Sequence, residues 1–83
     1  MNDDFTNAVL DYQNGRIPLD TIRNRVLIEV YAHLRRYRRK SEDEVSEFLL
    51  EFHDKIENLL KRYVAREVPF RHFLLRKIGR AHV

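Results

Sequence analysis

Apolar residues recur at intervals of three or four from residue 41 to residue 66, the pattern of one face of an α-helix. The stretch opens with Ser41-Glu42-Asp43-Glu44, in which the Ser41 hydroxyl and the Glu44 carboxylate fit a capping box at a helix N-terminus. We therefore predict one long helix over residues 41–66, with an apolar stripe directed at a core. The stripe consists of Val45, Phe48, Leu49, Phe52, Ile56, Leu59, Leu60 and Tyr63.

The opposite side of this predicted helix is polar and mostly acidic. At about 100° per residue, five positions point away from the apolar stripe, and all but one of them are acidic. The exception is Leu50. The arrangement is typical either of a solvated face that carries one exposed leucine, or of an acidic docking surface with an apolar residue at its centre. The five residues are Asp43, Glu47, Leu50, Asp54 and Glu57.

A shorter helix is predicted over residues 3–14, before the long one. Asn2 or Asp3 can cap its N-terminus, because their side chains accept hydrogen bonds from free backbone N–H groups. Gly15 is placed to end it in the left-handed conformation.

A second helix is predicted from Pro18 to about residue 38, since proline is tolerated in the first turn of a helix. This helix carries apolar residues on two sides. One stripe includes Val26 and Val30, and a second side includes Ile28 and Tyr31. A helix that is apolar on two sides is usually central, so we expect it to pack between the first helix and the long one.

A fourth, short helix is predicted after Pro69, because the residue before a proline is pushed out of the helical region and a turn belongs there. The expected fold is all-α: a compact bundle of three main helices plus a short C-terminal helix, in a single domain over residues 1–83.

The composition of the chain excludes several classes of functional site. The chain has no cysteine, which excludes disulfides and thiolate metal sites and agrees with a cytoplasmic location. No signal peptide and no apolar run of membrane-spanning length is present, so no membrane partner is expected. The sequence shows no pair of carboxylates suited to acid–base catalysis and no serine or threonine in a recognisable nucleophile motif. We therefore expect no catalytic residue, no cofactor and no metal. The histidines lie at His33, His53, His72 and His82, without a partner at ligand spacing.

Charge alternates along the chain, although the net charge is only +3. Residues 35–40 carry five basic groups and no acid, residues 41–58 carry seven acids against Lys55, and seven basic groups follow from Lys61 onward against Glu67. This segregation predicts two different partner surfaces rather than one uniform nucleic-acid patch.

Each basic stretch has two interpretations. The cations of residues 35–40 either satisfy a helix C-terminus and the acids that follow, or contact the phosphates of a nucleic acid. In the C-terminal stretch, basic residues interleaved with aromatic ones either bind nucleic acid by charge and stacking, or surround a core that the aromatic rings fill. The candidate DNA-binding residues there are Tyr63, Arg66, Phe70, Arg71, Phe73, Arg76 and Lys77.

Three parts of the chain together resemble conserved region two of bacterial RNA polymerase sigma factors. These are residues 42–52 (EDEVSEFLLEF), Tyr63, and residues 69–74 (PFRHFL). In that family an acidic start leads an amphipathic helix, an aromatic residue closes it, and a Pro-Phe segment opens the next helix. The resemblance covers about residues 20–78. The family's promoter-reading helix would follow this segment, and we expect it to be missing from these 83 residues.

The resemblance implies a docking site. In sigma factors the polar face of the long helix docks on a coiled coil of the largest subunit of core RNA polymerase. Two positions depart from the family pattern: Ser46 stands where a glutamine is usual, and Glu44 where an aliphatic residue is usual. Carried across by position, the docking residues are Asp43, Ser46, Glu47 and Leu50, with His53 and Asp54 at the margin.

The expected function is therefore a sigma-like transcription initiation module that docks on core RNA polymerase and contacts promoter DNA weakly. The alternative is a small helical adaptor, including a homodimer that pairs through Leu50, Leu75 and Ile28. A third interpretation, a stand-alone nucleic-acid binder, predicts an affinity that falls steeply with salt.

Overall fold

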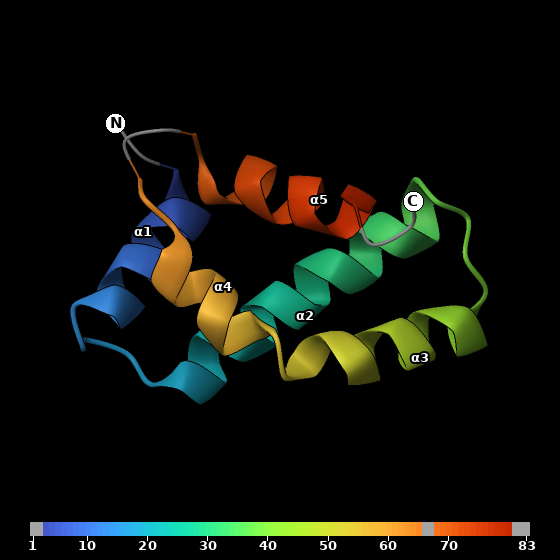
Figure 1. The fold of residues 1–83 in the computed structure, drawn as a ribbon, viewed down its shortest axis with the longest axis horizontal. Helices are drawn as coiled ribbons and strands as arrows, with labels where there is room; N and C mark the ends of the chain where they lie inside the picture. Colours follow the sequence, from blue (N-terminus) through green and yellow to red (C-terminus); the bar gives the residue numbers. More distant parts are fainter. Residues whose placement is uncertain (1–2, 66–67, 81–83) are drawn as a thin grey trace.

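Helix α2 (Leu19–Arg36) is the longest helix of the described residues, and it contacts α1, α3 and α4 (Figure 1). The computed structural model describes residues 3–65 and 68–80, and of residues 79 and 80 only the backbone. Within these ranges the chain forms five helices and no strand, which confirms the all-α class. The other helices are α1 (Asp4–Gln13), α3 (Glu42–His53), α4 (Ile56–Arg62) and α5 (Phe70–Arg80).

Local signals set the limits of α1 as predicted. The backbone N–H of Thr6 donates to Asp3 Oδ1 at 2.7 Å, so Asp3 is the N-cap. Hydrogen bonding to the charged form lowers the pKa of Asp3 below its ordinary value. After the helix, Gly15 adopts φ 75, a conformation that costs glycine little because it has no Cβ.

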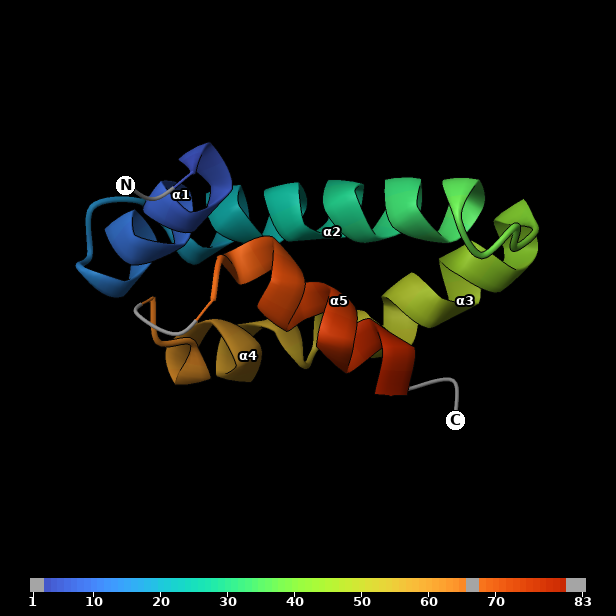
Figure 2. The ribbon, with the colours of Figure 1, turned by 90° about the horizontal axis from the view of Figure 1, so that it is seen from above.

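One stripe of α2 makes the core contacts. Ile22, Val26, Val30 and Leu34 follow one another at intervals of four, and each is 1% exposed or less. The second apolar side is not covered as the two-sided pattern predicted, because Ile28 remains 68% exposed. Figure 2 shows that the outer side of α2 is free of other helices beyond α1. The central position of α2 was thus predicted correctly, but one stripe is enough to produce it.

The single long helix predicted over residues 41–66 is wrong. The chain forms α3, a turn at Asp54 and Lys55, and then α4 (Figure 1). At the turn, the Lys55 N–H donates to the Phe52 carbonyl at 2.9 Å, three residues back rather than four. Ile56 and Leu60 are fully buried after the turn.

The size of the bundle explains this break. A straight helix of 26 residues would be about 39 Å long, whereas the longest dimension of the molecule is 35 Å. Helix α2, with 18 residues, is about 27 Å long, so the last two turns or so of such a helix would project beyond it. Bending at residues 54–55 instead brings α4 against α1 and α2, where its apolar residues are removed from water.

Helix α5 begins at Phe70, directly after Pro69, as predicted. The Phe70 N–H donates to the buried hydroxyl of Thr6 at 3.0 Å, which fixes the start of α5 against α1. The Phe70 ring meets those of Phe5 and Tyr63 edge-on, each at 5.1 Å between centroids. The core therefore joins three helices from the two ends of the chain.

None of the helices in the described ranges has both the length and the apolar character that a membrane crossing requires.

Candidate docking surface and basic groove

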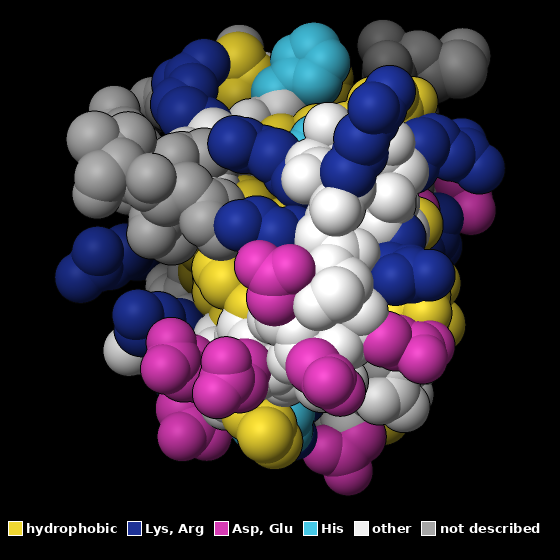
Figure 3. All heavy atoms as spheres, turned by 90° about the vertical axis from the view of Figure 1, so that its right-hand side faces the viewer, with side chains coloured by type: hydrophobic (Ala, Val, Ile, Leu, Met, Phe, Trp, Pro, Cys, Tyr) yellow, Lys and Arg dark blue, Asp and Glu magenta, His cyan; other side chains and the backbone are white. Residues whose placement is uncertain are grey.

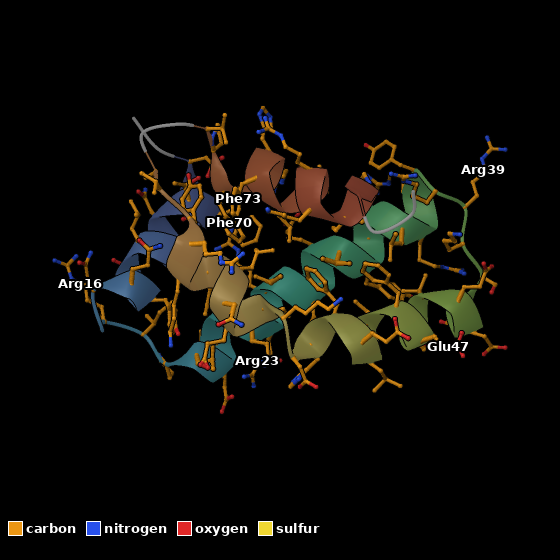
Figure 4. The ribbon with its side chains drawn as sticks, viewed as in Figure 1. Arg16, Arg23, Arg39, Glu47, Phe70 and Phe73 are labelled. Carbon is orange, nitrogen blue, oxygen red and sulfur yellow. The ribbon has the colours of Figure 1, made fainter. Side chains whose placement is uncertain are left out.

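The predicted docking residues lie on one exposed face of α3 and at its C-cap Asp54, opposite the side on which Val45 and Phe52 are buried. Leu50 is 76% exposed, the largest exposure among the large apolar side chains of the described residues. Figure 4 shows Glu47 directed away from the bundle. We call this the acidic face; it comprises Asp43, Ser46, Glu47, Leu50 and Asp54.

The acidic face is presented by a well-capped helix. The Glu44 N–H donates to Ser41 Oγ at 3.3 Å, and the Ser41 N–H donates to Glu44 Oε1 at 3.1 Å, which completes the predicted capping box. The bond from the Ser41 N–H to the Glu44 carboxylate holds the pKa of Glu44 below its ordinary value. The Lys40 ammonium adds an ion pair to Glu44 at 3.7 Å. The capping box gives two backbone N–H groups at the N-terminus of α3 an acceptor, which reduces fraying there.

Two acids at the centre of the face carry uncompensated charge. In the part of the chain that the structure describes, neither Asp43 nor Glu47 takes part in an ion pair. At the far end of the face, Asp54 is 92% exposed and lies 3.3 Å from Nδ1 of the half-buried His53. The face therefore offers an exposed leucine within a field of negative charge, a surface that favours a partner with cations around an apolar contact.

Two of the predicted DNA-binding aromatic residues lie in the core. Phe70 is fully buried and Tyr63 is 3% exposed, so neither offers a ring face on which a base can stack. The Tyr63 hydroxyl donates to the Val68 carbonyl at 2.5 Å, and burial raises the pKa of Tyr63. Phe73 is half-buried beside Phe70 (Figure 4). This arrangement agrees with the alternative interpretation, in which the rings fill the core.

The predicted basic residues of the same stretch are distributed around that core. Arg71 and Arg76 are exposed. Lys77 is half-buried, with its ammonium nitrogen 5.5 Å from the centre of the Phe73 ring. Arg66 lies outside the described residues.

A basic groove between α2 and α5 was not predicted as a unit. It has a volume of about 350 Å³. The His33 and Tyr37 rings lie 5.3 Å apart along one wall, and Tyr37 is 70% exposed. Burial, followed by the charge of Arg38, lowers the pKa of His33. The groove is lined by Glu29, Ala32, His33, Arg36, Tyr37, Arg71 and Leu75.

The sequence signal for this groove was the run of cations over residues 35–40, but its second wall comes from α5, more than thirty residues later. Arg71 reaches α2 through an ion pair between its Nη2 and Glu29 Oε1 at 3.2 Å. Figure 3 shows the outcome on one end of the molecule: acids gather on the lower part, over α3, and cations on the upper part, over the C-terminal end of α2 and α5.

No group of three or more His, Asp or Glu side chains in the described ranges is placed to hold a metal ion. Comparison with known proteins gave no match to a family model, to a curated protein or to a solved structure.

Proposed function

We propose that this protein is a sigma-like transcription module that docks on core RNA polymerase through the acidic face of α3. The observation that carries the proposal is Leu50, which is 76% exposed among the acids Asp43, Glu47 and Asp54. Those residues coincide with the docking positions that the resemblance to sigma region two implies. The proposed partner is the coiled coil of the polymerase's largest subunit.

The physical basis is an apolar contact surrounded by charge. Leu50 supplies apolar area that a partner can remove from water. Asp43 and Glu47 are free to pair with cations on the partner, which speeds the encounter and sets the orientation of docking. Because α3 already has its cap and its core contacts, binding does not have to order the helix first.

The test is binding of the full chain to the isolated coiled-coil fragment of the polymerase, measured by titration calorimetry. Leu50→Ala and Glu47→Lys are each expected to weaken binding by about 1–3 kcal/mol, the range of hot-spot residues. Two control variants match them away from α3. Val64→Ala shortens another exposed aliphatic side chain, and Asp11→Lys makes the same change in net charge on α1.

Failure of the folded parent to bind would overturn the proposal. Equal losses in Asp11→Lys and Glu47→Lys would also overturn it, because they would show a response to net charge rather than to the acidic face. The adaptor alternative makes a different prediction: a homodimer through Leu50 has a mass in solution that rises with concentration, whereas the docking proposal requires a monomer with that face free.

A second candidate function, contact with promoter DNA, is supported by the basic groove. Tyr37 is 70% exposed and offers the ring that buried Tyr63 and Phe70 do not. Arg36 and Arg71 line the same groove and can meet phosphates on either side of a stacked base. We therefore propose that any DNA contact is made at the groove between α2 and α5.

The test is binding of a fluorescent single-stranded oligonucleotide at several salt concentrations. Removal of one phosphate contact in Arg36→Ala is expected to reduce the slope of log affinity against log salt by about 0.7. Tyr37→Ala is expected to weaken binding at every salt concentration. Arg16→Ala removes an exposed cation at the opposite end of the molecule (Figure 4) and is the control. Equal effects of Arg16→Ala and Arg36→Ala would contradict a localised site.

A further inference from the structure

The outer side of α2 carries two large apolar side chains that remain exposed to water. Ile28 is 68% exposed and Tyr31, one turn later, is 38% exposed. Neither belongs to the acidic face or to the basic groove. The hydroxyl of Tyr31 donates to Glu42 Oε1 at 3.2 Å, so this side of α2 meets the first turn of α3.

These side chains are continuous with the acidic face. Helices α2 and α3 are joined by a short loop, run in roughly opposite directions at an angle to each other, and are in contact (Figure 1). On α3, Leu49 lies by helical position between the buried stripe and the side of Ser46 and Leu50; on α2, Leu27 lies likewise beside Ile28. Both Leu27 and Leu49 are half-buried against the core. By helical position they lie along the line where the two helices meet, which we call the seam.

We infer that α2 and α3 together form one docking surface, whose apolar contacts are Ile28 and Tyr31 from α2 and Leu50 from α3. We call it the two-helix face. The inference rests on the proposed function, which it deepens by adding the outer side of α2 and by defining the chemistry of the partner. The partner is a basic amphipathic helix that lies along the seam.

Charge selects that partner. Between residues 42 and 54 the chain has six acids and no Lys or Arg. A helix that carries cations beside its apolar stripe therefore matches the α3 side of the two-helix face. The side chains of a third helix fit between the ridges of two antiparallel helices by ordinary helix packing.

A second copy of this chain is the wrong occupant. A two-fold interface places the same surface on both subunits. Where α3 meets α3 across the two-fold axis, the acids Asp43 and Glu47 of one copy would lie close to those of the other. Like charges across an interface oppose association, so the two-helix face is built for a different chain.

The experiment measures binding of the full chain to the coiled-coil fragment of the polymerase, with Ile28→Ala and Tyr31→Ala beside Leu50→Ala. Each α2 variant is expected to weaken binding about fivefold or more, as truncation of a contact residue does. Val64→Ala, which shortens an exposed aliphatic side chain away from both helices, is expected to leave the affinity unchanged within about twofold. Ile28 is exposed, so its truncation leaves the fold intact, and circular dichroism spectra of all variants verify this.

The outcomes separate the two proposals. If Leu50→Ala weakens binding and both α2 variants bind like the parent, docking stands and the two-helix face is wrong. If the folded parent does not bind the fragment, the proposed function fails and the inference falls with it. The third outcome concerns the mass of the protein in solution. If that mass rises with protein concentration in the parent but not in Ile28→Ala, a second copy occupies the face, and this would also overturn the inference.

Discussion

The two ends of the molecule place similar side chains in opposite environments. At the end where α1, α4 and α5 meet, Phe5, Tyr63 and Phe70 are at most 3% exposed, and the Phe70 ring contacts the other two. We call this the closed end. At the end formed by the C-terminal half of α2 and by α3, which we call the open end, Tyr37 and Leu50 are at least 70% exposed.

The hydrogen bonds at the two ends also differ in the sequence separation of their partners. At the closed end they join distant parts of the chain: the Thr6 hydroxyl accepts from the Phe70 N–H at 3.0 Å, and the Gln13 amide donates to the Leu60 and Tyr63 carbonyls at 2.7 and 3.0 Å. At the open end most are local, such as the capping box of α3. The closed end therefore carries tertiary stability, and the open end can change its surface chemistry without loss of the fold.

The largest effect is expected from truncation of the closed-end aromatic cluster. Phe70→Ala should lower the free energy of unfolding by about 3–5 kcal/mol, because it removes buried area and leaves a cavity beside Phe5 and Tyr63. Leu50→Ala should change it by no more than about 0.5 kcal/mol, since the side chain is already in water. Urea unfolding measures both. Similar losses in the two variants would abolish the distinction between the ends.

A smaller effect is expected at the buried hydroxyl that links α1 to α5. Thr6→Val keeps the shape of the side chain but leaves the Phe70 N–H without an acceptor, at a cost of about 1–3 kcal/mol. Thr6→Ser retains the hydroxyl and is the control for lost packing. If Thr6→Ser destabilises as much as Thr6→Val, the methyl group matters at this site and the hydrogen bond does not.

At the open end, the cap of α3 should contribute less. Ser41→Ala removes the acceptor for the Glu44 N–H and should lower the free energy of unfolding by about 1 kcal/mol. Ser41→Asp keeps an acceptor at the N-cap and should restore most of that loss. A loss in Ser41→Ala as large as that of Phe70→Ala would show that the open end also controls global unfolding.

The smallest effect is the dependence of stability on pH. The pKa of His33 is lowered by burial, so the unfolded state binds the proton more readily. Its contribution is complete above the ordinary value of 6.5 and is lost as the pH falls from there through the lower folded value. Asp3 and Glu44 also have lowered pKa values in the folded state. Their contributions are complete above the ordinary 3.8 and 4.5 and are lost as the pH falls through the folded values.

Stability is therefore expected to fall in two steps on acidification. Urea midpoints at about pH 7.5, 5.5 and 3.5 would separate these steps, because the histidine titrates before the carboxylates. His33→Gln should remove only the upper step. An unchanged upper step in that variant would mean that another group titrates there.

The local parts of the fold were predictable from the sequence. Asp3 caps α1, Gly15 takes a positive φ after it, Ser41 and Glu44 form the capping box, and Pro69 precedes α5. Each of these features depends on hydrogen bonds or backbone preferences within about four residues. The exposed positions on α3 were predicted for the same reason, since the helical period alone assigns them to one side.

The bend between α3 and α4 and the choice of which apolar residues are buried depend on tertiary structure, and the apolar periodicity of the sequence does not predict them. The turn at Asp54 and Lys55 keeps the backbone near helical values, so the apolar spacing of residues 45–63 continues across it without a sign of the bend. The bend is favourable because it brings the apolar residues of α4 against α1 and α2, which are distant in sequence. In the same way, Phe70 and Ile28 are both large and apolar, but a core formed by distant segments buries Phe70 and leaves Ile28 in water.

The sequence by itself thus determined where four of the five helices begin and which sides of them are apolar, because these properties arise from neighbouring residues. The tertiary structure alone decided which apolar sides are covered. It also placed Arg36 of α2 and Arg71 of α5 in the lining of one groove. Burial depends on the contacts of the whole chain, and a segment does not contain that information.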